Sequence, residues 1–137
     1  DELVTDLCDI ELLVLDEVST IGAASFEIVC RRLEQVGKAL WRQRHGTRAP
    51  TDLGEFGGMG VLLIGDFAQL PPVLSSTLLS GATLMEGKKS GHRTLALAGR
   101  QTFEQFHTVI RLRRIHRILG ADPYKESTMR LRDAAIT

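Results

Sequence analysis

Two adjacent carboxylates close the first apolar run of the sequence. Residues 11–15 read Glu-Leu-Leu-Val-Leu, a run typical of a buried strand in a parallel sheet, and Asp16 and Glu17 follow it directly. The carboxyl edge of such a sheet faces the crevice where ligands bind. An aspartate there can hold Mg²⁺, largely through water, and a glutamate can orient and deprotonate an attacking water. A strand that ends in a polar turn explains the same pair, so the pair alone leaves both interpretations open.

A second apolar run leads into a longer and more specific motif. Residues 61–64 read Val-Leu-Leu-Ile, and residues 65–73 continue as Gly-Asp-Phe-Ala-Gln-Leu-Pro-Pro-Val. Asp66 can join a magnesium network or anchor its loop. Gln69 carries an amide that can reach a γ-phosphate or its attacking water, and the two prolines stop regular structure and fix the loop. A turn-forming aspartate and a surface glutamine are the alternative, which the length of the run makes a minor one.

The elements that position these motifs alternate between strands and helices. Apolar residues recur at steps of three and four from Phe26 to Trp41, which predicts an amphipathic helix after the first strand. This alternation predicts an α/β fold in which helices flank a parallel sheet. The remaining predictions are a loop over residues 42–60, irregular structure over 75–100, a short helix over 101–106, a third strand over 108–112 and a helix over 122–134.

Composition narrows the class of protein. The chain has 137 residues, of which 43% are hydrophobic and 25% charged, as is ordinary for a globular domain. Seventeen basic residues balance seventeen acidic ones, which excludes a global polyelectrolyte mode of binding nucleic acid or membrane. No apolar run approaches the roughly 20 residues of a membrane span. The two cysteines form no disulfide framework, so we expect an intracellular location.

The balanced total hides a separation of charge along the chain. Residues 1–30 hold eight acids and no base, residues 31–48 hold six bases and one acid, and residues 86–117 hold eight bases and two acids. An acidic cluster that does chemistry beside a basic surface that holds an anion would give this pattern. A set of solvated faces that balance in three dimensions would give it equally well.

In order and spacing these motifs resemble the Pif-type DNA helicases. Those are superfamily 1 enzymes related to RecD, and they include the helicase domains of Helitron transposons. The resemblance rests on the Asp-Glu-Val-Ser at residues 16–19, the Phe-Gly-Gly at 56–58 and the run at 65–73. Residues 109–117 are similar to the family's stretch that ends in a phosphate-sensing arginine. Residues 131–133 are similar to its later Leu-Arg-Asp segment.

The resemblance implies a fold and an activity. The implied fold is an incomplete RecA-like P-loop NTPase, with the C-terminal part of a first motor domain over residues 1–107 and the start of a second over 108–137. The implied activity is 5′-to-3′ unwinding of DNA driven by hydrolysis of Mg-ATP, with roles in repair, recombination or telomere maintenance. DNA, as single strands and duplex junctions, is the implied partner. We expect no membrane partner, and no obligate protein partner is evident from the sequence. The implied location is the nucleus or mitochondrion if the source is eukaryotic.

The resemblance also implies roles for individual residues. Asp16 would hold the magnesium ion of Mg-ATP, and Glu17 would be the catalytic base. Gln69 would sense the γ-phosphate and couple the state of the nucleotide to DNA binding. Asp66 would support the loop that carries Gln69. Arg117 would contact the γ-phosphate from the far side of the cleft and stabilise the charge that develops in phosphoryl transfer. Because arginines cluster there, a solvated or phosphate-binding surface is the alternative for Arg117; the cluster is Arg111, Arg113, Arg114 and Arg117.

The phosphate loop that this chemistry requires does not occur in the sequence. A Walker A loop needs Gly, four residues and then Gly-Lys-Ser/Thr. The nearest segment, residues 81–89, has five intervening residues, ends in Lys-Lys and follows the Asp-Glu strand instead of preceding it. We therefore expect an excerpt of a helicase whose Walker A lies upstream. The alternative is a degenerate transposon-derived or inactive nucleic-acid-binding fragment without ATPase activity. A second alternative is a P-loop ATPase that is not a helicase, such as a signalling ATPase. Residues 65–73 argue against it, because that run resembles the helicases.

Overall fold

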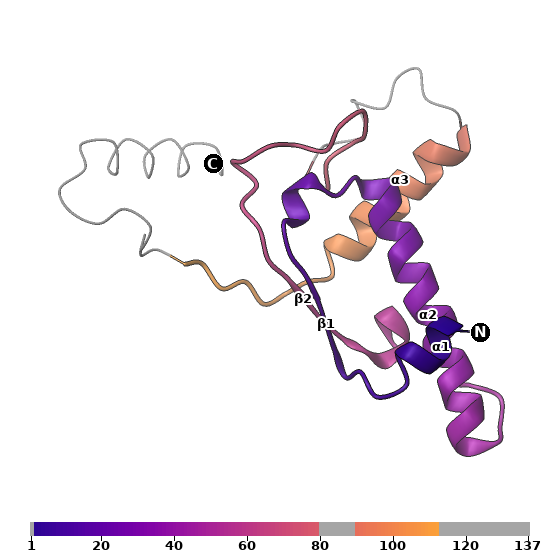
Figure 1. The fold of residues 1–137 in the computed structure, drawn as a ribbon. Coiled ribbons are helices and arrows are strands. Elements are labelled where there is room, and N and C mark those ends of the chain that lie inside the picture. Colours follow the sequence, from indigo (N-terminus) through magenta and orange to yellow (C-terminus); the bar gives the residue numbers. More distant parts are fainter. Residues whose placement is uncertain (1, 80–89, 113–137) are drawn as a thin grey trace.

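A computed structural model of the chain describes residues 2–79 and 90–112. Short strands and longer helices alternate along these residues, which makes the described part a small α/β structure, as predicted (Figure 1). In chain order the elements are helix α1 (Glu2–Asp6), strand β1 (Leu12–Leu15), 3₁₀ turn η1 (Val18–Thr20), helix α2 (Ala23–His45), 3₁₀ turn η2 (Glu55–Gly58), strand β2 (Gly60–Leu63) and helix α3 (Ser90–Phe103).

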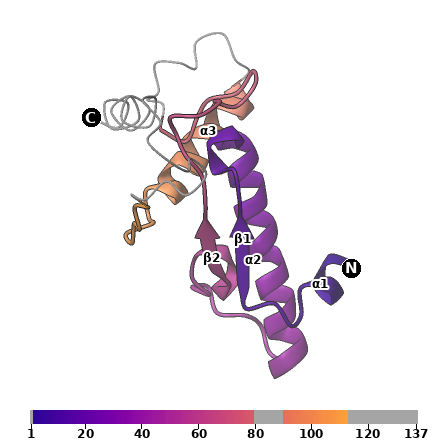
Figure 2. The ribbon, with the colours of Figure 1, turned by 60° about the vertical axis from the view of Figure 1, so that its left-hand side comes forward.

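The two strands pair in parallel, as the two apolar runs predicted. Leu12 lies opposite Gly60 and Leu15 lies opposite Leu63 in a two-stranded sheet. Beyond the last pair, the Ile64 N–H donates to the Leu15 carbonyl at 2.8 Å, so the pairing continues past the strand ends. Because the strands are parallel, both carboxyl ends lie at the same edge of the sheet (Figure 2).

Helix α2 connects the strands and is longer than predicted. It ends at His45 and is capped by Gly46, whose left-handed conformation with φ 65° and N–H bond to the Arg42 carbonyl close the last turn. Residues 42–45 are therefore helical, and their prediction as part of a loop was wrong. The reason is that these residues are polar but tolerate a helix, and their basic side chains favour its negative C-terminal end; the basic residues of this turn are Arg42, Arg44 and His45.

The core lies between α2, α3 and the inner face of the sheet. Phe26 of α2 is fully buried, and its ring meets the ring of Phe103 edge-on with centroids 6.4 Å apart. Leu15 and Leu63 pack against this core from the strands. The buried members of the cluster are Val18, Ala23, Ala24, Phe26, Cys30, Leu78 and Ala96.

Helix α3 crosses the first turns of α2 at very short range (Figure 1). A Cβ added at Gly99 would lie 2.0 Å from the Ala23 carbonyl oxygen, so only glycine permits this approach. The prediction of irregular structure over residues 75–100 was wrong for residues 90–100, which belong to α3. Of the helix that was expected over 101–106, residues 101–103 are the end of α3 and residues 104–106 follow it outside the helix. Gly91, Thr94 and Gly99 lower the intrinsic helix propensity of this segment, and its packing on α2 outweighs that local preference.

The third strand expected over residues 108–112 does not form, so that prediction was wrong. Val109, Ile110 and Leu112 are 84%, 79% and 77% exposed and belong to no strand. Their apolar, β-branched sequence favours a strand only where a neighbouring strand can pair with it. The helix expected over residues 122–134 lies outside the described residues.

The outer face of the sheet is exposed within the described residues. Along each strand inward and outward residues alternate, and Leu12, Val14 and Leu62 point away from the core and are exposed. The prediction that both strands are buried therefore holds for one face only. None of the described helices is both long and apolar enough to span a bilayer.

Candidate functional site

Asp16 and Glu17 lie at the carboxyl end of β1, where the sequence predicted them. Both side chains are exposed. The Asp16 Oδ1 atom accepts a hydrogen bond from the Glu17 N–H at 2.8 Å, which ties the first carboxylate to the backbone of the second residue. Glu17 adopts a left-handed conformation with φ 53° and ψ 39°. That conformation is uncommon for a residue with a side chain, and it turns the chain sharply out of the strand.

The turn after Glu17 is held by its own hydrogen bonds. The Glu17 carbonyl accepts the Thr20 N–H at 2.9 Å and the Thr20 hydroxyl at 2.8 Å. Ser19 is buried, and its hydroxyl has no hydrogen-bond partner among the described residues. Thr20 thus bonds the backbone of the candidate base and not its carboxylate. The turn η1 then leads into α2.

Asp66 and Gln69 lie in the loop that follows β2. The Asp66 Oδ1 atom accepts the Ala68 N–H at 3.0 Å, and the Asp66 carbonyl accepts the Gln69 N–H at 3.0 Å. These bonds make a compact turn of the kind that aspartate favours. Asp66 is half-buried, whereas the Gln69 side chain is exposed and free to meet a ligand. Farther along the loop, Pro72 is buried and anchors it to the fold.

The two loops meet at the carboxyl edge of the sheet. The Val18 N–H donates to the Ile64 carbonyl at 2.9 Å, which joins the turn after β1 to the start of the loop after β2. Gly65 packs directly against the Val18 backbone. The structure therefore brings together the backbones that carry Asp16, Glu17, Asp66 and Gln69. Within residues 2–79 and 90–112 it gives no hydrogen bond or ion pair between those four side chains. Arg117 lies outside the described residues.

The donor set at this edge suits one kind of metal ion. Among the described residues no group of three or more His, Cys, Asp or Glu side chains could hold a metal by itself. Mg²⁺ needs no such cage, because it commonly binds one or two carboxylates together with substrate phosphates and water. The exposed carboxylate of Asp16 fits that mode.

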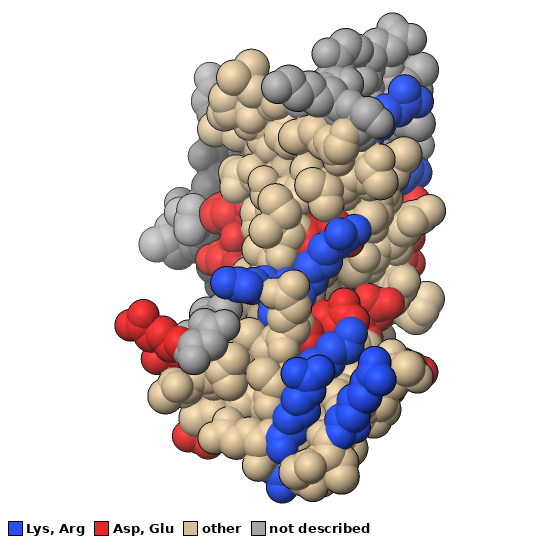
Figure 3. Space-filling view, turned by 90° about the vertical axis from the view of Figure 1, so that its right-hand side faces the viewer, with Lys and Arg blue, Asp and Glu red and all other residues tan. Residues whose placement is uncertain are grey.

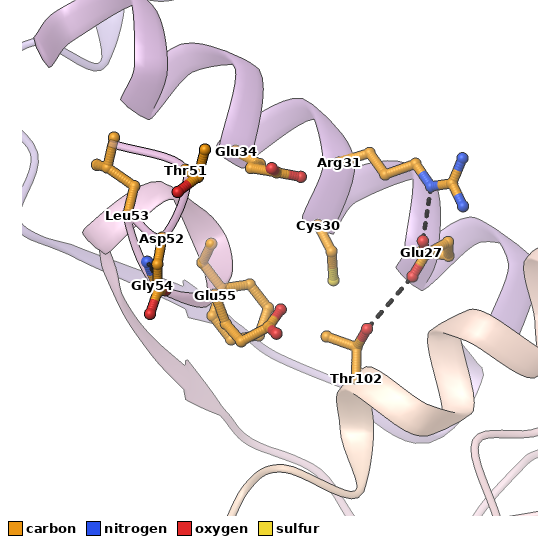
Figure 4. Close-up of a pocket in the computed structure, with 11 residues that line it drawn as sticks. Glu27, Cys30, Arg31, Glu34, Thr51, Asp52, Leu53, Gly54, Glu55 and Thr102 are labelled. Atoms are coloured by element: carbon orange, nitrogen blue, oxygen red, sulfur yellow. Dashed lines mark hydrogen bonds and ion pairs between the residues drawn. The ribbon is translucent and has the colours of Figure 1, made fainter. Parts of the chain in front are cut away.

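The structure also holds an acidic pocket that the sequence analysis missed. It encloses about 200 Å³ between α2, residues 51–56 and α3. Figure 4 shows Glu27 at its wall, bonded to Arg31 at 2.6 Å and facing the Thr102 hydroxyl at 3.4 Å. A signal was present, because Glu27 and Glu34 recur at helical spacing on the Cys30 side of α2. The carboxylates of the pocket are Glu27, Glu34, Asp52 and Glu55.

Cys30 lies in the wall of this pocket and is buried with a free thiol. Burial, reinforced by the negative charge of Glu27, raises the pKa of the Cys30 thiol to about 12. The thiol is therefore protonated at neutral pH, which suits a structural residue and not a nucleophile. The pocket adjoins η2, which precedes β2, so it does not belong to the strand ends that carry Asp16 and Asp66.

Most basic side chains of α2 are engaged locally. Lys38 forms an ion pair with Glu34, and Arg31 forms one with Glu27. The Arg44 guanidinium donates to the Cys8 carbonyl. Figure 3 shows Lys and Arg side chains interleaved with Asp and Glu on one face of the molecule. On this face the separation of charge along the sequence is largely balanced in three dimensions.

Comparison with known proteins gives one match. A family model described as PIF1-like helicase matches residues 1–130. The matched range contains both strand-end motifs and also Arg117. No curated protein and no solved structure matches the chain.

Proposed function

The chain belongs to the PIF1-like helicase family, and we propose that it forms part of the motor of an ATP-dependent DNA helicase. The proposed fold is that of a RecA-like P-loop NTPase, with the first motor domain over residues 1–107 and the second beginning at 108. The observation that carries the proposal is the shared carboxyl edge, where the Val18–Ile64 hydrogen bond joins the two loops with the candidate residues. Ligands of open α/β sheets bind at such an edge.

Asp16 would hold the magnesium ion of Mg-ATP in this proposal. The ion supplies positive charge that neutralises the phosphates during phosphoryl transfer. The Asp16 carboxylate is exposed at the strand end, and one of its oxygens is oriented by the Glu17 N–H at 2.8 Å. No hydrogen bond to the other oxygen is found among the described residues. That arrangement supports a role in holding an ion.

Glu17 would be the general base that accepts a proton from the attacking water. Its carboxylate projects from a turn fixed by two backbone hydrogen bonds, from Thr20 N–H to the Glu17 carbonyl and from Val18 N–H to the Ile64 carbonyl, and by one side-chain bond from the Thr20 hydroxyl to the Glu17 carbonyl. Its side chain is exposed and therefore accessible to water. A general base contributes roughly 10²–10⁴ in rate, and this contribution depends on its position relative to the attacking water.

Asp66 and Gln69 would connect nucleotide state with DNA. One oxygen of the Asp66 carboxylate accepts the Ala68 N–H, and Asp66 is half-buried where Asp16 is exposed, so we assign Asp66 the support of its loop. Gln69 then presents its amide from a turn that Asp66 shapes, and it would contact the γ-phosphate or its attacking water. Arg117 completes the proposed site as the arginine that contacts the γ-phosphate from the second motor domain.

The test of this proposal is the coupling between hydrolysis and strand separation in the complete protein. We expect DNA-stimulated ATP hydrolysis and 5′-to-3′ unwinding by the wild type. In Gln69→Ala we expect more ATP consumed per base pair opened, because the nucleotide sensor is lost while Glu17 remains. Gln43→Ala, which removes an exposed amide near the end of α2, is the matched control and should leave that ratio unchanged.

Two results would contradict the proposal. Absence of DNA-stimulated hydrolysis in the complete protein would favour the alternative, an inactive fragment that binds nucleic acid. An unchanged ratio of ATP consumed to base pairs opened in Gln69→Ala would remove the coupling role from that residue.

A further inference from the structure

The peptide unit between Glu17 and Val18 is held at both of its ends. Its carbonyl accepts two bonds from Thr20, at 2.9 Å from the N–H and 2.8 Å from the hydroxyl. Its N–H, which belongs to Val18, donates to the Ile64 carbonyl at 2.9 Å. The plane of this peptide sets ψ of Glu17, and it therefore helps to determine where the Glu17 side chain projects.

The conformation held in this way is unfavourable by itself. Glu17 has φ 53°, in the left-handed region that residues with a Cβ rarely adopt. Such a conformation persists only where contacts with the surrounding structure stabilise it by more than its local strain costs. Here the surroundings are Thr20 on one side and the strand end Ile64–Gly65 on the other.

Gly65 touches the held peptide directly. A Cβ added at Gly65 would lie 2.9 Å from the Val18 nitrogen, 2.9 Å from Val18 Cγ1 and 3.3 Å from the Ser19 nitrogen. Two of these three atoms belong to the backbone, which can retreat only by lengthening the Val18–Ile64 hydrogen bond. A side chain at residue 65 would thus push on the peptide that positions Glu17.

We infer that Gly65 is a positioning residue for Glu17, and that Thr20 supports the same turn from the opposite side. The inference rests on the proposed function, since it assumes that Glu17 is the base. It goes beyond that function by linking the loop of Asp66 and Gln69 to the base through backbone contacts. A displacement of residues 65–73 would be transmitted through Ile64 to the Glu17–Val18 peptide without any contact between the side chains.

The kinetic test uses the complete protein with Gly65→Ala. We expect kcat for DNA-stimulated ATP hydrolysis to fall by roughly 10²-fold, as a misplacement of about 1 Å does, with KM for ATP nearly unchanged. Gly91→Ala is the matched control, because a Cβ at Gly91 meets no atom of the described residues within 4 Å. It should keep the wild-type kcat.

A second pair of variants keeps the inference testable if Gly65→Ala fails to fold. Thr20→Val removes the hydroxyl bond to the Glu17 carbonyl at nearly constant shape, and Thr20→Ser retains a hydroxyl. We expect Thr20→Val to lower kcat severalfold at constant KM and Thr20→Ser to restore it. A purely structural role of the hydroxyl would instead lower the thermal midpoint of Thr20→Val and leave its kcat unchanged.

The results distinguish a failure of this inference from a failure of the proposed function on which it rests. If Glu17→Gln is inactive while Gly65→Ala and Thr20→Val match the wild-type kcat, the inference is overturned and the proposed function stands. If the wild type does not hydrolyse ATP, the proposed function fails and the kinetic role of Gly65 fails with it. Hydrogen exchange then still tests the contact, because Gly65→Ala should reduce protection of the Val18 amide. Unchanged protection would overturn the inference independently of activity.

Discussion

At the scale of single residues, the main finding is the strained backbone of Glu17. Among the described residues, three that are not glycine have positive φ: Glu17, Phe56 and Leu74. Glu17 is the one that was also predicted to do chemistry. A conformation of this kind costs on the order of 1–3 kcal/mol and persists at sites where function requires it. Its presence supports the role proposed for Glu17.

The strain predicts that Glu17→Gly stabilises the folded chain. Glycine accepts φ 53° without steric cost, although it loses more entropy on folding, so we expect a net gain of up to about 1 kcal/mol. Urea denaturation measures the free energy of unfolding. Glu11→Gly is the control, because Glu11 precedes β1 without positive φ, and it should lose stability. A lower free energy of unfolding in Glu17→Gly would show that its conformation stores no strain.

The Cys30 thiol gives a second prediction at this scale. Its pKa is raised from 9.0 to about 12, because burial and Glu27 disfavour the thiolate. Stability from this group is therefore fully present below pH 9 and is lost as pH rises toward 12. In a Cys8→Ser background at pH 8, we expect alkylation of folded protein about 10³-fold slower than in urea, since thiolate is the reactive form. Similar rates in both states would contradict the burial of Cys30.

At the scale of elements, the packing of α2 on α3 determines stability. Phe26 is 0% exposed and meets Phe103 from α3, so Phe26→Ala should lower the free energy of unfolding by about 3–5 kcal/mol. Ile28 lies on the same helix but is 56% exposed. Ile28→Ala should change it by no more than about 0.5 kcal/mol. Equal losses in the two variants, measured by denaturant titration, would contradict the assigned orientation of α2.

The sequence predicted the elements that have strong apolar patterns. The runs at residues 11–15 and 61–64 predicted the strands, and the periodicity from Phe26 to Trp41 predicted α2. It failed for α3, since Gly91, Thr94 and Gly99 lower the local helix propensity and the packing of the segment on α2 outweighs it. It also failed at residues 108–112, where strand formation depends on a partner strand and not on local preference.

The candidate site was predictable in part. Because parallel strands share a carboxyl edge, the sequence could place Asp16 and Asp66 at one end of the sheet. It could not predict the left-handed Glu17 or the contact of Gly65 with Val18. Both features depend on the contact between the two loops, and the sequence around each residue does not predict that contact. The roles of Asp16, Glu17, Asp66, Gln69 and Arg117 stay predictions.

At the scale of the whole molecule, the match over residues 1–130 confirms the family that the motifs resemble. One face of the two-stranded sheet is uncovered in the structure, since Leu12, Val14 and Leu62 are exposed on it. Strands of parallel sheets are usually covered on both faces. The boundary proposed near residue 107 stays a prediction; it lies between Phe106, which packs against the core, and the exposed Val109.

The central claim is that this chain carries the hydrolytic residues of an ATP-dependent helicase. Its most direct test is ATP turnover by the complete protein with Glu17→Gln, measured together with nucleotide binding. We predict a fall in kcat of roughly 10²–10⁴-fold with binding retained, because the general base is lost while Asp16 remains. Glu11→Gln, an exposed acid at the other end of β1, should behave as the wild type. Turnover of Glu17→Gln within tenfold of the wild type would contradict the account.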